Sequence, residues 1–508
     1  MRAQENMKRS GILMHVSSLP SKYGIGTLGE EAYNFIDFLS SSNCTVWQVL
    51  PLGQTGFGDS PYQSVSSFAG NPYFIDLETL VKEDLLISSD LPEKRATNLG
   101  IDYGELYIKK YATLRKSFEK SYFKVSSEVE KFKEEHEWID DYSMFMAIKN
   151  HYKGESWQNW KDEKLRMHNA EAIQTARAIL QDDINFYCYV QYLFFKQWRA
   201  LRDYANKKSI KICGDLPIYC ALDSADVWGN SECFQLSEEK VPQKVAGVPP
   251  DYFSADGQLW GNPLYDWKHL DKTEYKFWIK RMQATAELFD IVRIDHFIGF
   301  VNYYSIDASA TTAKEGVWEK GPKHPLFKAI QSNVPQLEII AEDLGSLSAE
   351  VTALKEDFNF PGMHVLMFMV PLQKTHDQEY LPLQITENSV CYTGTHDNDT
   401  TLSWWKNLDD NSKHSILESF KIKNDKNIVT DLISICFASD SQTVIIPIQD
   451  YLNLGGEARM NTPGTSENNW QFRINSGDLT KSLSKKIAGL NKKYKRALQV
   501  KTTSKHRK

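Results

Sequence analysis

The sequence predicts an α/β fold, a (β/α)8 TIM barrel with helical and loop-rich insertions between its strands. Short apolar, β-branched runs recur along the 508 residues, and each is followed by a loop and a helix-like stretch. The runs are nearly continuous in apolar character, which is typical of parallel strands covered on both faces. The eight predicted strands are 12–16, 46–50, 210–213, 291–294, 337–341, 363–369, 390–393 and 444–448.

The gap between the second and third predicted strands is far longer than one β-α unit. We therefore expect a mostly helical inserted subdomain at 53–185, with a helical segment at 107–120. A long aromatic helix at 186–204, which has no internal glycine or proline, leads into the third strand. A second insertion at 220–272 is rich in glycine and proline and is predicted to be loop-rich.

The C-terminal segment 485–508 is strongly basic, and no acidic residue follows Asp478. We expect a last helix followed by a basic tail, because chain ends are commonly of this kind. A contact with RNA or with a charged surface is the alternative interpretation.

Bulk composition argues against several classes of partner. A formal charge of -7 is too mild to indicate nucleic acid or an anionic membrane. Seven cysteines, odd in number and without a C-x-x-C pair, predict reduced thiols. The first apolar run ends at Val16, too early for a secretory signal. We expect a cytoplasmic protein that binds neither nucleic acid nor membrane.

Carboxylates follow four of the predicted strands, namely Asp215, Asp295, the pair Glu342 and Asp343, and Asp397. In a barrel of this kind, residues just after the strands line the functional mouth. A single aspartate in this position is more often a helix cap or a turn residue. Carboxylates after several strands together are better explained by a shared site.

Two carboxyl groups on either side of a glycosidic bond are what retaining glycoside chemistry requires, roughly 5 to 5.5 Å apart. One carboxylate attacks the anomeric carbon, and the other donates and later accepts a proton. Arg293 precedes Asp295 by two residues, so both side chains point into the same mouth, and its charge keeps that carboxylate ionised. His296 and His396 are candidates for binding sugar hydroxyls. Zinc ligation or simple packing is the alternative for these histidines, and no third histidine or cysteine has matching spacing.

Seven segments together resemble the 4-α-glucanotransferases of glycoside hydrolase family 77, also called amylomaltases or disproportionating enzymes. The similarity extends from about Gly11 to Arg473. The segments are SSLPSKYGIGTLG (17–29), PLGQTGFGDSPYQ (51–63), GDLPIY (214–219), GVPPDYFSADGQLWGNPLYDW (247–267), VRIDHFIGF (292–300), IIAEDLG (339–345) and TGTHDNDT (393–400).

The resemblance implies a role for each matched residue. Asp295 would be the nucleophile, Glu342 the general acid/base and Asp397 the transition-state stabiliser. It implies one catalytic barrel over 1–508 that needs no metal and no organic cofactor. Residues implied to bind the sugar at the cleavage point are Tyr62, Asp215, Arg293, His296 and His396. Residues implied to form an acceptor-side lid are Asp251, Tyr252, Phe253, Gln258 and Trp260, with Asn262 at its end.

The implied reaction moves segments of α-1,4-glucans and maltooligosaccharides to an acceptor such as glucose. A lid that excludes water and stacks on an acceptor sugar would favour transfer over hydrolysis. Phe57 stands where family members often have tyrosine, which leaves open whether a secondary glucan-binding site exists there. A monomer or weak homo-oligomer is expected, acting in maltose or glycogen metabolism.

Two other functions are compatible with parts of this pattern. An α-amylase-like hydrolase would use the same three carboxylates. A non-catalytic glucan-binding protein could share the barrel, although a binding module has no use for an acid/base pair.

Overall fold

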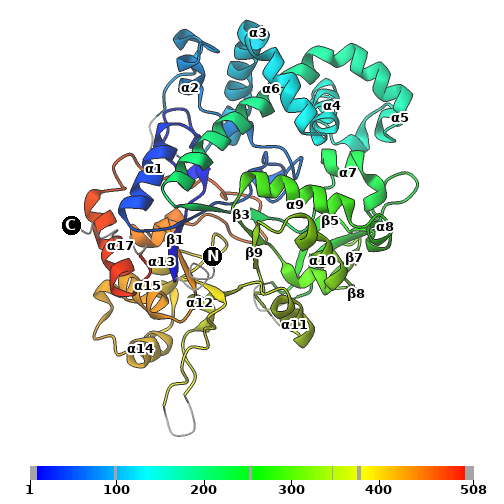
Figure 1. Ribbon diagram of the computed structural model, residues 1–508. Coiled ribbons are helices and arrows are strands. Elements are labelled where there is room, and N and C mark those ends of the chain that lie inside the picture. Colours follow the sequence, from blue (N-terminus) through cyan, green and yellow to red (C-terminus); the bar gives the residue numbers. More distant parts are fainter. Residues whose placement is uncertain (1–7, 96–99, 251–253, 346, 375–378, 498–508) are drawn as a thin grey trace, which may run out of the picture.

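The computed structural model describes residues 8–95, 100–250, 254–345, 347–374 and 379–497. Eight parallel strands form one sheet in the order β10-β11-β12-β1-β2-β3-β6-β9. The sheet nearly closes, because the Ala341 N–H at the end of β9 donates to the Pro361 carbonyl beside β10 at 2.9 Å (Figure 1). The strands are β1 (Arg9–Leu13), β2 (Val46–Gln48), β3 (Lys211–Leu216), β6 (Ile291–Ile294), β9 (Glu338–Ala341), β10 (Gly362–Val365), β11 (Ser389–Tyr392) and β12 (Thr443–Pro447).

The predicted barrel is therefore confirmed, and each of the eight predicted strands overlaps an observed one. The first is shifted most, since β1 begins at Arg9 and ends at Leu13. The sixth is shorter than predicted, because the chain leaves the sheet after Val365 and forms the short helix α12 (Leu366–Met369). Strands such as β11 and β12 are buried at every residue, which explains their unbroken apolar sequence.

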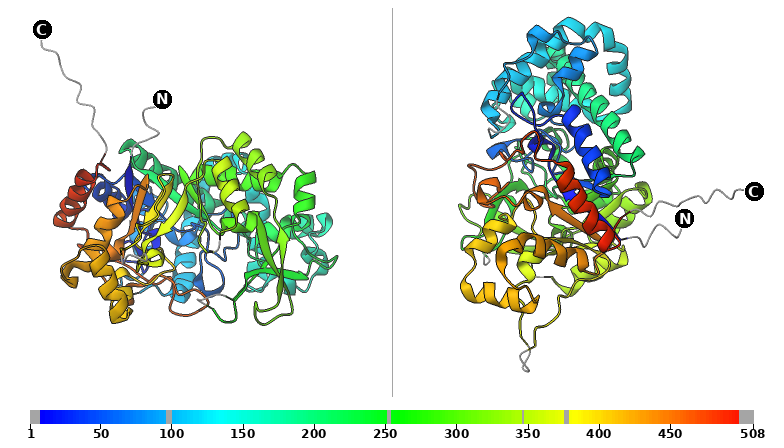
Figure 2. Two further views of the ribbon diagram at one scale, coloured as in Figure 1. Left: turned by 90° about the horizontal axis from the view of Figure 1, so that it is seen from below. Right: turned by 90° about the vertical axis from the view of Figure 1, so that its left-hand side faces the viewer.

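Helices cover the outside of the barrel, and the helices of the first insertion extend the molecule on one side. Figure 2 shows the blue-to-cyan helices between β2 and β3 stacked beyond the barrel. They share the barrel's continuous apolar core. These helices are α2 (Leu77–Lys82), α3 (Tyr103–Glu135), α4 (Trp138–His151), α5 (Glu163–Arg166) and α6 (Ala170–Lys207).

Two of these helices are longer than the sequence predicts. α3 contains the expected segment 107–120 but continues for 33 residues in all, and α6 begins well before residue 186. Leu180, with φ -104° and ψ 18°, interrupts the helical geometry of α6. The longer part of α6, after this point, carries most of its buried side chains, and the indole of Trp198 donates to the Leu288 carbonyl at 2.9 Å.

Part of the second insertion joins an antiparallel sheet that is not predicted from the sequence, and the other two strands of this sheet come after β6. Its strands, in the order β5-β4-β7-β8, enclose a small separate core around Ile306. Gly247 and Gly261 lie within its strands, so a glycine-rich sequence here pairs as a hairpin instead of forming loops. The strands are β4 (Lys244–Val248), β5 (Gln258–Pro263), β7 (Asn302–Asp307) and β8 (Gly316–Lys320).

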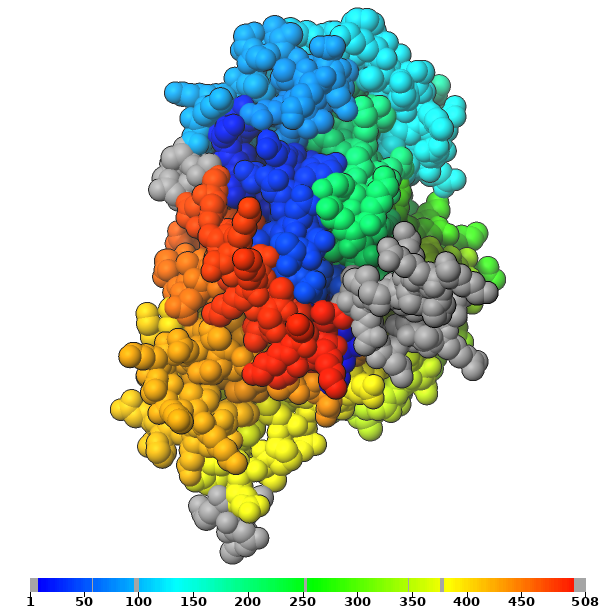
Figure 3. Space-filling model, turned by 60° about the vertical axis from the view of Figure 1, so that its left-hand side comes forward, coloured from blue at the N-terminus to red at the C-terminus, as the bar shows by residue number. Residues whose placement is uncertain are grey.

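The last helix, α17 (Lys481–Lys493), packs against the N-terminal part of the chain. In Figure 3 it appears in red beside the blue segment. The Asn491 amide donates to the Ser42 carbonyl at 2.9 Å, and the buried Arg496 donates to the carbonyl of Ser441 at 2.9 Å. The basic segment therefore begins as a packed helix. Residues 498–508 lie outside the described part of the chain.

The remaining helices lie mostly between successive strands, as a β-α repeat requires. These remaining helices are α1 (Glu30–Ser41), α7 (Ala225–Gly229), α8 (Trp267–Lys272), α9 (Lys276–Leu288), α10 (His324–Asn333), α11 (Ala349–Asp357), α13 (Thr401–Asn407), α14 (Asp410–Ser419), α15 (Ile428–Ala438) and α16 (Ile448–Tyr451).

No helix in the described part of the chain has the length and apolar character needed to cross a membrane.

Candidate active site

Strand register brings polar residues of neighbouring strands side by side at the barrel mouth, in two levels that are two residues apart. Asp215 lies directly opposite Arg293 in the β3–β6 pair. The Glu342 N–H continues the β6–β9 ladder by donating to the Ile294 carbonyl at 3.0 Å. Asp295 and Glu342 are therefore each the first residue after neighbouring strands.

Arg293 joins two of these carboxylates. Its Nη1 lies 2.8 Å from both carboxylate oxygens of Asp215 and 2.9 Å from Oδ1 of Asp295. The hydroxyl of Tyr62 donates to Asp215 at 2.9 Å. Arg293 and Asp215 are each 3% exposed, so this is a buried ion pair whose partners depend on each other.

The pKa values of this pair reflect burial and charge acting together. Burial raises the pKa of Asp215 above its ordinary value, although Arg293 acts to lower it. Burial opposes the charge of Arg293, but Asp215 and Asp295 outweigh that effect and raise the pKa of Arg293. The guanidinium therefore stays charged beside Asp295, which is more open to the mouth with a side chain 28% exposed.

Glu342 is held by the backbone on both carboxylate oxygens. Oε2 accepts the N–H of His296 at 2.7 Å, and Oε1 accepts the N–H of Leu344 at 3.0 Å. Burial raises the pKa of Glu342 to about 7, with Arg293 acting against this rise and Asp295 adding to it. A carboxyl group with such a pKa can donate and accept protons near neutral pH.

Asp397 follows β11 and is fixed by residues from the segment after β12. Asn461 donates from Nδ2 to Oδ1 of Asp397 at 2.7 Å, and Arg459 donates to the Asp397 backbone carbonyl at 2.9 Å. Nε2 of His396 lies 3.3 Å from Oδ2 of the same carboxylate. Asn461 and Arg459 are not predicted from the sequence, because neither directly follows a predicted strand.

Aromatic rings form one wall of the mouth. The Tyr62 and His396 rings are stacked, with centroids 5.2 Å apart and planes 14° apart, and Trp470 lies 5.8 Å from Tyr62. Such flat apolar faces suit the apolar faces of sugar rings. Trp470 is a further member that the sequence analysis did not identify.

The lid residues predicted from sequence divide into two groups. Asp251, Tyr252 and Phe253 lie outside the described residues. Gln258, Trp260 and Asn262 belong to β5.

The residues of β5 are tied to the mouth by contacts of their own. The Trp260 ring meets His296 edge-on at 4.9 Å, and its indole N–H donates to Gln258 at 3.1 Å. Gln63 donates to Asn262 at 3.1 Å and so fastens this strand to the segment that carries Tyr62.

His296 has an unusual backbone and an unused ring nitrogen. Its φ of 53° lies in the left-handed region, which residues other than glycine rarely adopt. Its buried Nε2 has no hydrogen-bond partner among the described residues. Burial lowers the pKa of His296, with Asp295 opposing, so the neutral ring is available to a ligand hydroxyl.

The residues predicted from sequence thus form one connected set wherever they are described. Hydrogen bonds and an ion pair link Tyr62, Asp215, Arg293 and Asp295 in a row, while Glu342 binds the backbone next to Asp295. Within the described ranges, the single grouping of side chains with metal-ligand spacing lies elsewhere, in the second insertion.

An eight-stranded parallel barrel with four carboxylates and an arginine at its C-terminal mouth has the architecture of a glycoside-acting barrel enzyme. Comparison with known proteins is consistent with this class. The family model described as 4-alpha-glucanotransferase matches residues 14–480, and the chain belongs to that family.

Individual relatives match over nearly the whole chain. The 4-alpha-glucanotransferase of Clostridium butyricum is 46% identical over 492 residues, which cover 95% of this chain and 100% of that protein. That of Thermus thermophilus is 42% identical and covers 92% of this chain and 95% of its own length. The structure of amylomaltase from Streptococcus agalactiae in complex with acarbose superimposes with a TM-score of 0.93 at 37% identity. That match covers 97% of this chain and 100% of the other.

Proposed function

We propose that this enzyme transfers a segment of an α-1,4-glucan to the 4-hydroxyl of glucose or of another α-1,4-glucan by retaining double displacement. The observation that carries the proposal is the placement of Asp295 and Glu342 on adjacent strand ends, each with its own environment. Asp295 faces a charged guanidinium, whereas Glu342 is half-buried and has a raised pKa. A carboxyl group that holds its proton near neutral pH, beside a second carboxylate, is what an acid and a nucleophile require.

In the first step, a carboxylate oxygen of Asp295 forms a bond to the anomeric carbon of the donor. The bond from that carbon to the leaving glycosidic oxygen breaks, and Glu342 gives its proton to that oxygen. The positive charge of Arg293, 2.9 Å from Oδ1 of Asp295, compensates the negative charge of the attacking carboxylate.

In the second step, Glu342 removes the proton from the 4-hydroxyl of the acceptor. The resulting oxygen attacks the anomeric carbon, and the bond to Asp295 breaks. Asp397 would stabilise the positive charge that develops on the sugar ring in both steps. Asn461 orients this carboxylate by binding Oδ1 of Asp397, and Oδ2 lies beside Nε2 of His396.

The sugar at the cleavage point would be held by Tyr62, Asp215, His296 and His396. Trp260 would cover the acceptor side together with Asp251, Tyr252, Phe253 and Gln258. The Streptococcus agalactiae amylomaltase was crystallised with acarbose, which supports binding of such an oligosaccharide in the same mouth. Water exclusion by this cover would favour a sugar hydroxyl as the second nucleophile.

The organisation inferred from sequence is proposed in the same way. One catalytic barrel would span 1–508, with insertions at 53–185 and 220–272 and a basic segment at 485–508. The shared apolar core supports the first insertion as part of the same unit. All seven cysteines are free and buried, which supports a cytoplasmic enzyme, and a monomer or weak homo-oligomer remains the prediction.

The direct test is incubation of purified protein with maltotriose, with products separated by size and reducing ends counted, beside an Asp295→Asn variant. A ladder of longer oligosaccharides plus glucose at constant reducing ends, absent in the variant, is the expected result. Rising reducing ends would mean a hydrolase. No product from maltotriose or from longer glucans would indicate a binding protein instead.

A further inference from the structure

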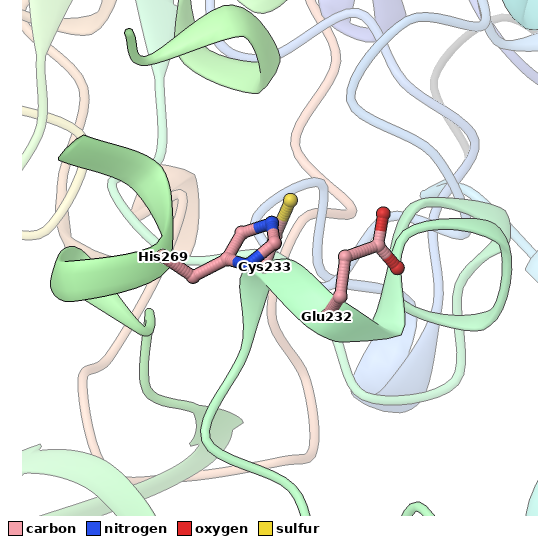
Figure 4. A group of neighbouring side chains, drawn as sticks. All are labelled: Glu232, Cys233 and His269. Atoms are coloured by element: carbon pink, nitrogen blue, oxygen red, sulfur yellow. The ribbon is translucent and has the colours of Figure 1, made fainter. Parts of the chain in front are cut away.

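Three side chains with metal-binding atoms converge in the second insertion, away from the barrel mouth. They are Glu232, Cys233 and His269, and one ligand atom from each lies within 4.8 Å of the other two. Figure 4 shows the imidazole of His269 beside the sulfur of Cys233, with the Glu232 carboxylate on the other side of that sulfur. The site has a graded exposure, because Cys233 is buried, His269 is half-buried and Glu232 is exposed.

None of these three side chains has a hydrogen-bond or ion-pair partner among the described residues, so their donor atoms are uncommitted. The backbone that carries them is fixed. The Asp266 N–H donates to the Cys233 carbonyl at 2.9 Å, and the Asp266 carboxylate accepts the N–H of His269 at 3.0 Å. Cys233 and His269 are therefore held near each other by the fold, and only side-chain rotation is needed to adjust them.

Local structure also explains how two consecutive residues can serve one ion. Glu232 and Cys233 lie in the 3-10 turn Ser231–Cys233. Consecutive side chains in such a turn are about 120° apart, whereas in a strand they point to opposite faces. His269 approaches from the separate helix α8.

We propose that Glu232, Cys233 and His269 bind a Zn²⁺ ion, with water completing a tetrahedral site on the exposed side. Thiolate, imidazole and carboxylate are the ligands that zinc takes in proteins. Mg²⁺ and Ca²⁺ prefer oxygen ligands alone, so a set containing sulfur and nitrogen excludes them as the natural ion.

The geometry requires a modest contraction on binding. Bonds of about 2.0 to 2.3 Å in a tetrahedron place ligand atoms about 3.5 Å apart. The Glu232 side chain is exposed and can supply most of the movement by rotation. Burial raises the pKa of the Cys233 thiol to about 12, with Glu232 adding to the rise, so the thiol carries its proton before metal binds. Zn²⁺ then replaces that proton, which passes to solvent.

The ion would act as a clamp at the base of the β4–β5 hairpin. Cys233 precedes β4 and His269 follows β5, so the segment closed by the metal contains the hairpin and Trp260. Trp260 contacts His296 at the barrel mouth. Zinc would therefore stabilise the part of the insertion that covers the proposed acceptor side.

The test uses untagged, chelator-stripped full-length protein titrated with Zn²⁺ in equilibrium dialysis and with Co²⁺ in absorption spectroscopy. We expect one Zn²⁺ per chain and, with Co²⁺, a thiolate-to-cobalt charge-transfer band with tetrahedral visible bands. Cys233→Ser should abolish the charge-transfer band, and His269→Gln should weaken Zn²⁺ binding at least about tenfold. Zn²⁺ should also raise the melting temperature of the wild type but not of the variants.

Two matched controls alter the same residue types outside the cluster. Cys188→Ala changes another buried thiol, in α6, and His414→Gln changes an exposed histidine in α14. Both should bind Zn²⁺ like the wild type. Should Cys233→Ser fail to fold, His269→Gln decides the question, because His269 is only half-buried. Absence of the charge-transfer band in folded wild type, or unchanged zinc binding in His269→Gln, would overturn the proposal. Transferase activity is measured separately and does not enter this decision.

Discussion

Nη1 of Arg293 lies 2.9 Å from the Asp295 carboxylate, at the end of the same strand. The same nitrogen binds both oxygens of Asp215, so one buried cation serves two anions. Removing the Arg293 guanidinium would leave two negative charges, on Asp215 and Asp295, facing each other where little solvent reaches them.

Arg293→Gln is expected to destabilise the fold as well as the reaction. Breaking a buried ion pair by removing one partner costs about 3 kcal/mol or more, and kcat should fall at least about 100-fold as Asp295 loses its counter-charge. Thermal unfolding and initial rates with maltotriose measure the two effects. Arg293→Lys keeps the charge and should lose less of both. Equal losses in the two variants would show that charge is not the reason for the arginine.

Tyr62 is expected to contribute through its ring more than through its hydroxyl. Tyr62→Phe removes the hydrogen bond to Asp215 and should lower kcat/KM about tenfold, as expected for a bond to a charged group. Tyr62→Ala also removes the ring stacked on His396 and should lower it about 100-fold or more. Equal effects of the two variants on kcat/KM would contradict a role for the ring.

Asn461 is expected to position Asp397. Asn461→Ala removes the 2.7 Å hydrogen bond to Oδ1 and should lower kcat/KM about 10- to 100-fold with little loss of thermal stability. Asn461→Asp should be worse, because a second carboxylate would face Asp397. The prediction fails if the aspartate variant is the more active of the two.

The raised pKa of Glu342 predicts the alkaline side of the pH profile. Glu342 must hold its proton for the first step, and with a pKa of about 7 it does so up to near neutrality. The rate kcat/KM should therefore fall as pH rises through about 7, since that quantity reports the free enzyme. If Glu342 had the ordinary pKa of 4.5, it would lose its proton, and the enzyme its activity, well below neutrality. A fall in kcat/KM centred near pH 5 would therefore contradict the assignment of Glu342 as the acid.

Trp260 is expected to limit hydrolysis. Trp260→Ala opens the cover beside His296 and should raise the ratio of hydrolysis to transfer about tenfold, because water gains access to the intermediate. Reducing ends counted against glucose released from maltotriose give this ratio. Trp318→Ala, an exposed tryptophan on β8, is the matched control and should leave the ratio unchanged. An unchanged ratio of hydrolysis to transfer in Trp260→Ala would show that Trp260 does not limit hydrolysis.

The barrel and its mouth were predictable because each depends on a local signal. A buried parallel strand is a continuous apolar run, and Asp295 and Glu342 come directly after such runs. The structure adds that register, which sequence does not encode locally, aligns Asp215 with Arg293. That alignment lets Arg293 contact both Asp215 and Asp295.

Other members of the site carry no such signal. Asn461 and Trp470 belong to an irregular segment after β12, and only the tertiary fold returns it to the mouth. The antiparallel sheet was also missed, because its hairpin contains the glycines and prolines that normally indicate loops. The zinc-ligand grouping joins a turn and a helix separated by that hairpin, so spacing along the chain could not reveal it.

The central claim is a covalent glycosyl intermediate on Asp295, and trapping it is the most direct test. The Glu342→Gln variant would be mixed with maltotriosyl fluoride, whose fluoride leaves without needing a proton, and then quenched in acid and digested for mass spectrometry. The account predicts a glycosyl mass addition on the peptide containing Asp295, absent when Asp295→Asn is also present. A label on another carboxylate, or turnover of the fluoride with no labelled peptide under conditions where the intermediate should accumulate, would contradict it.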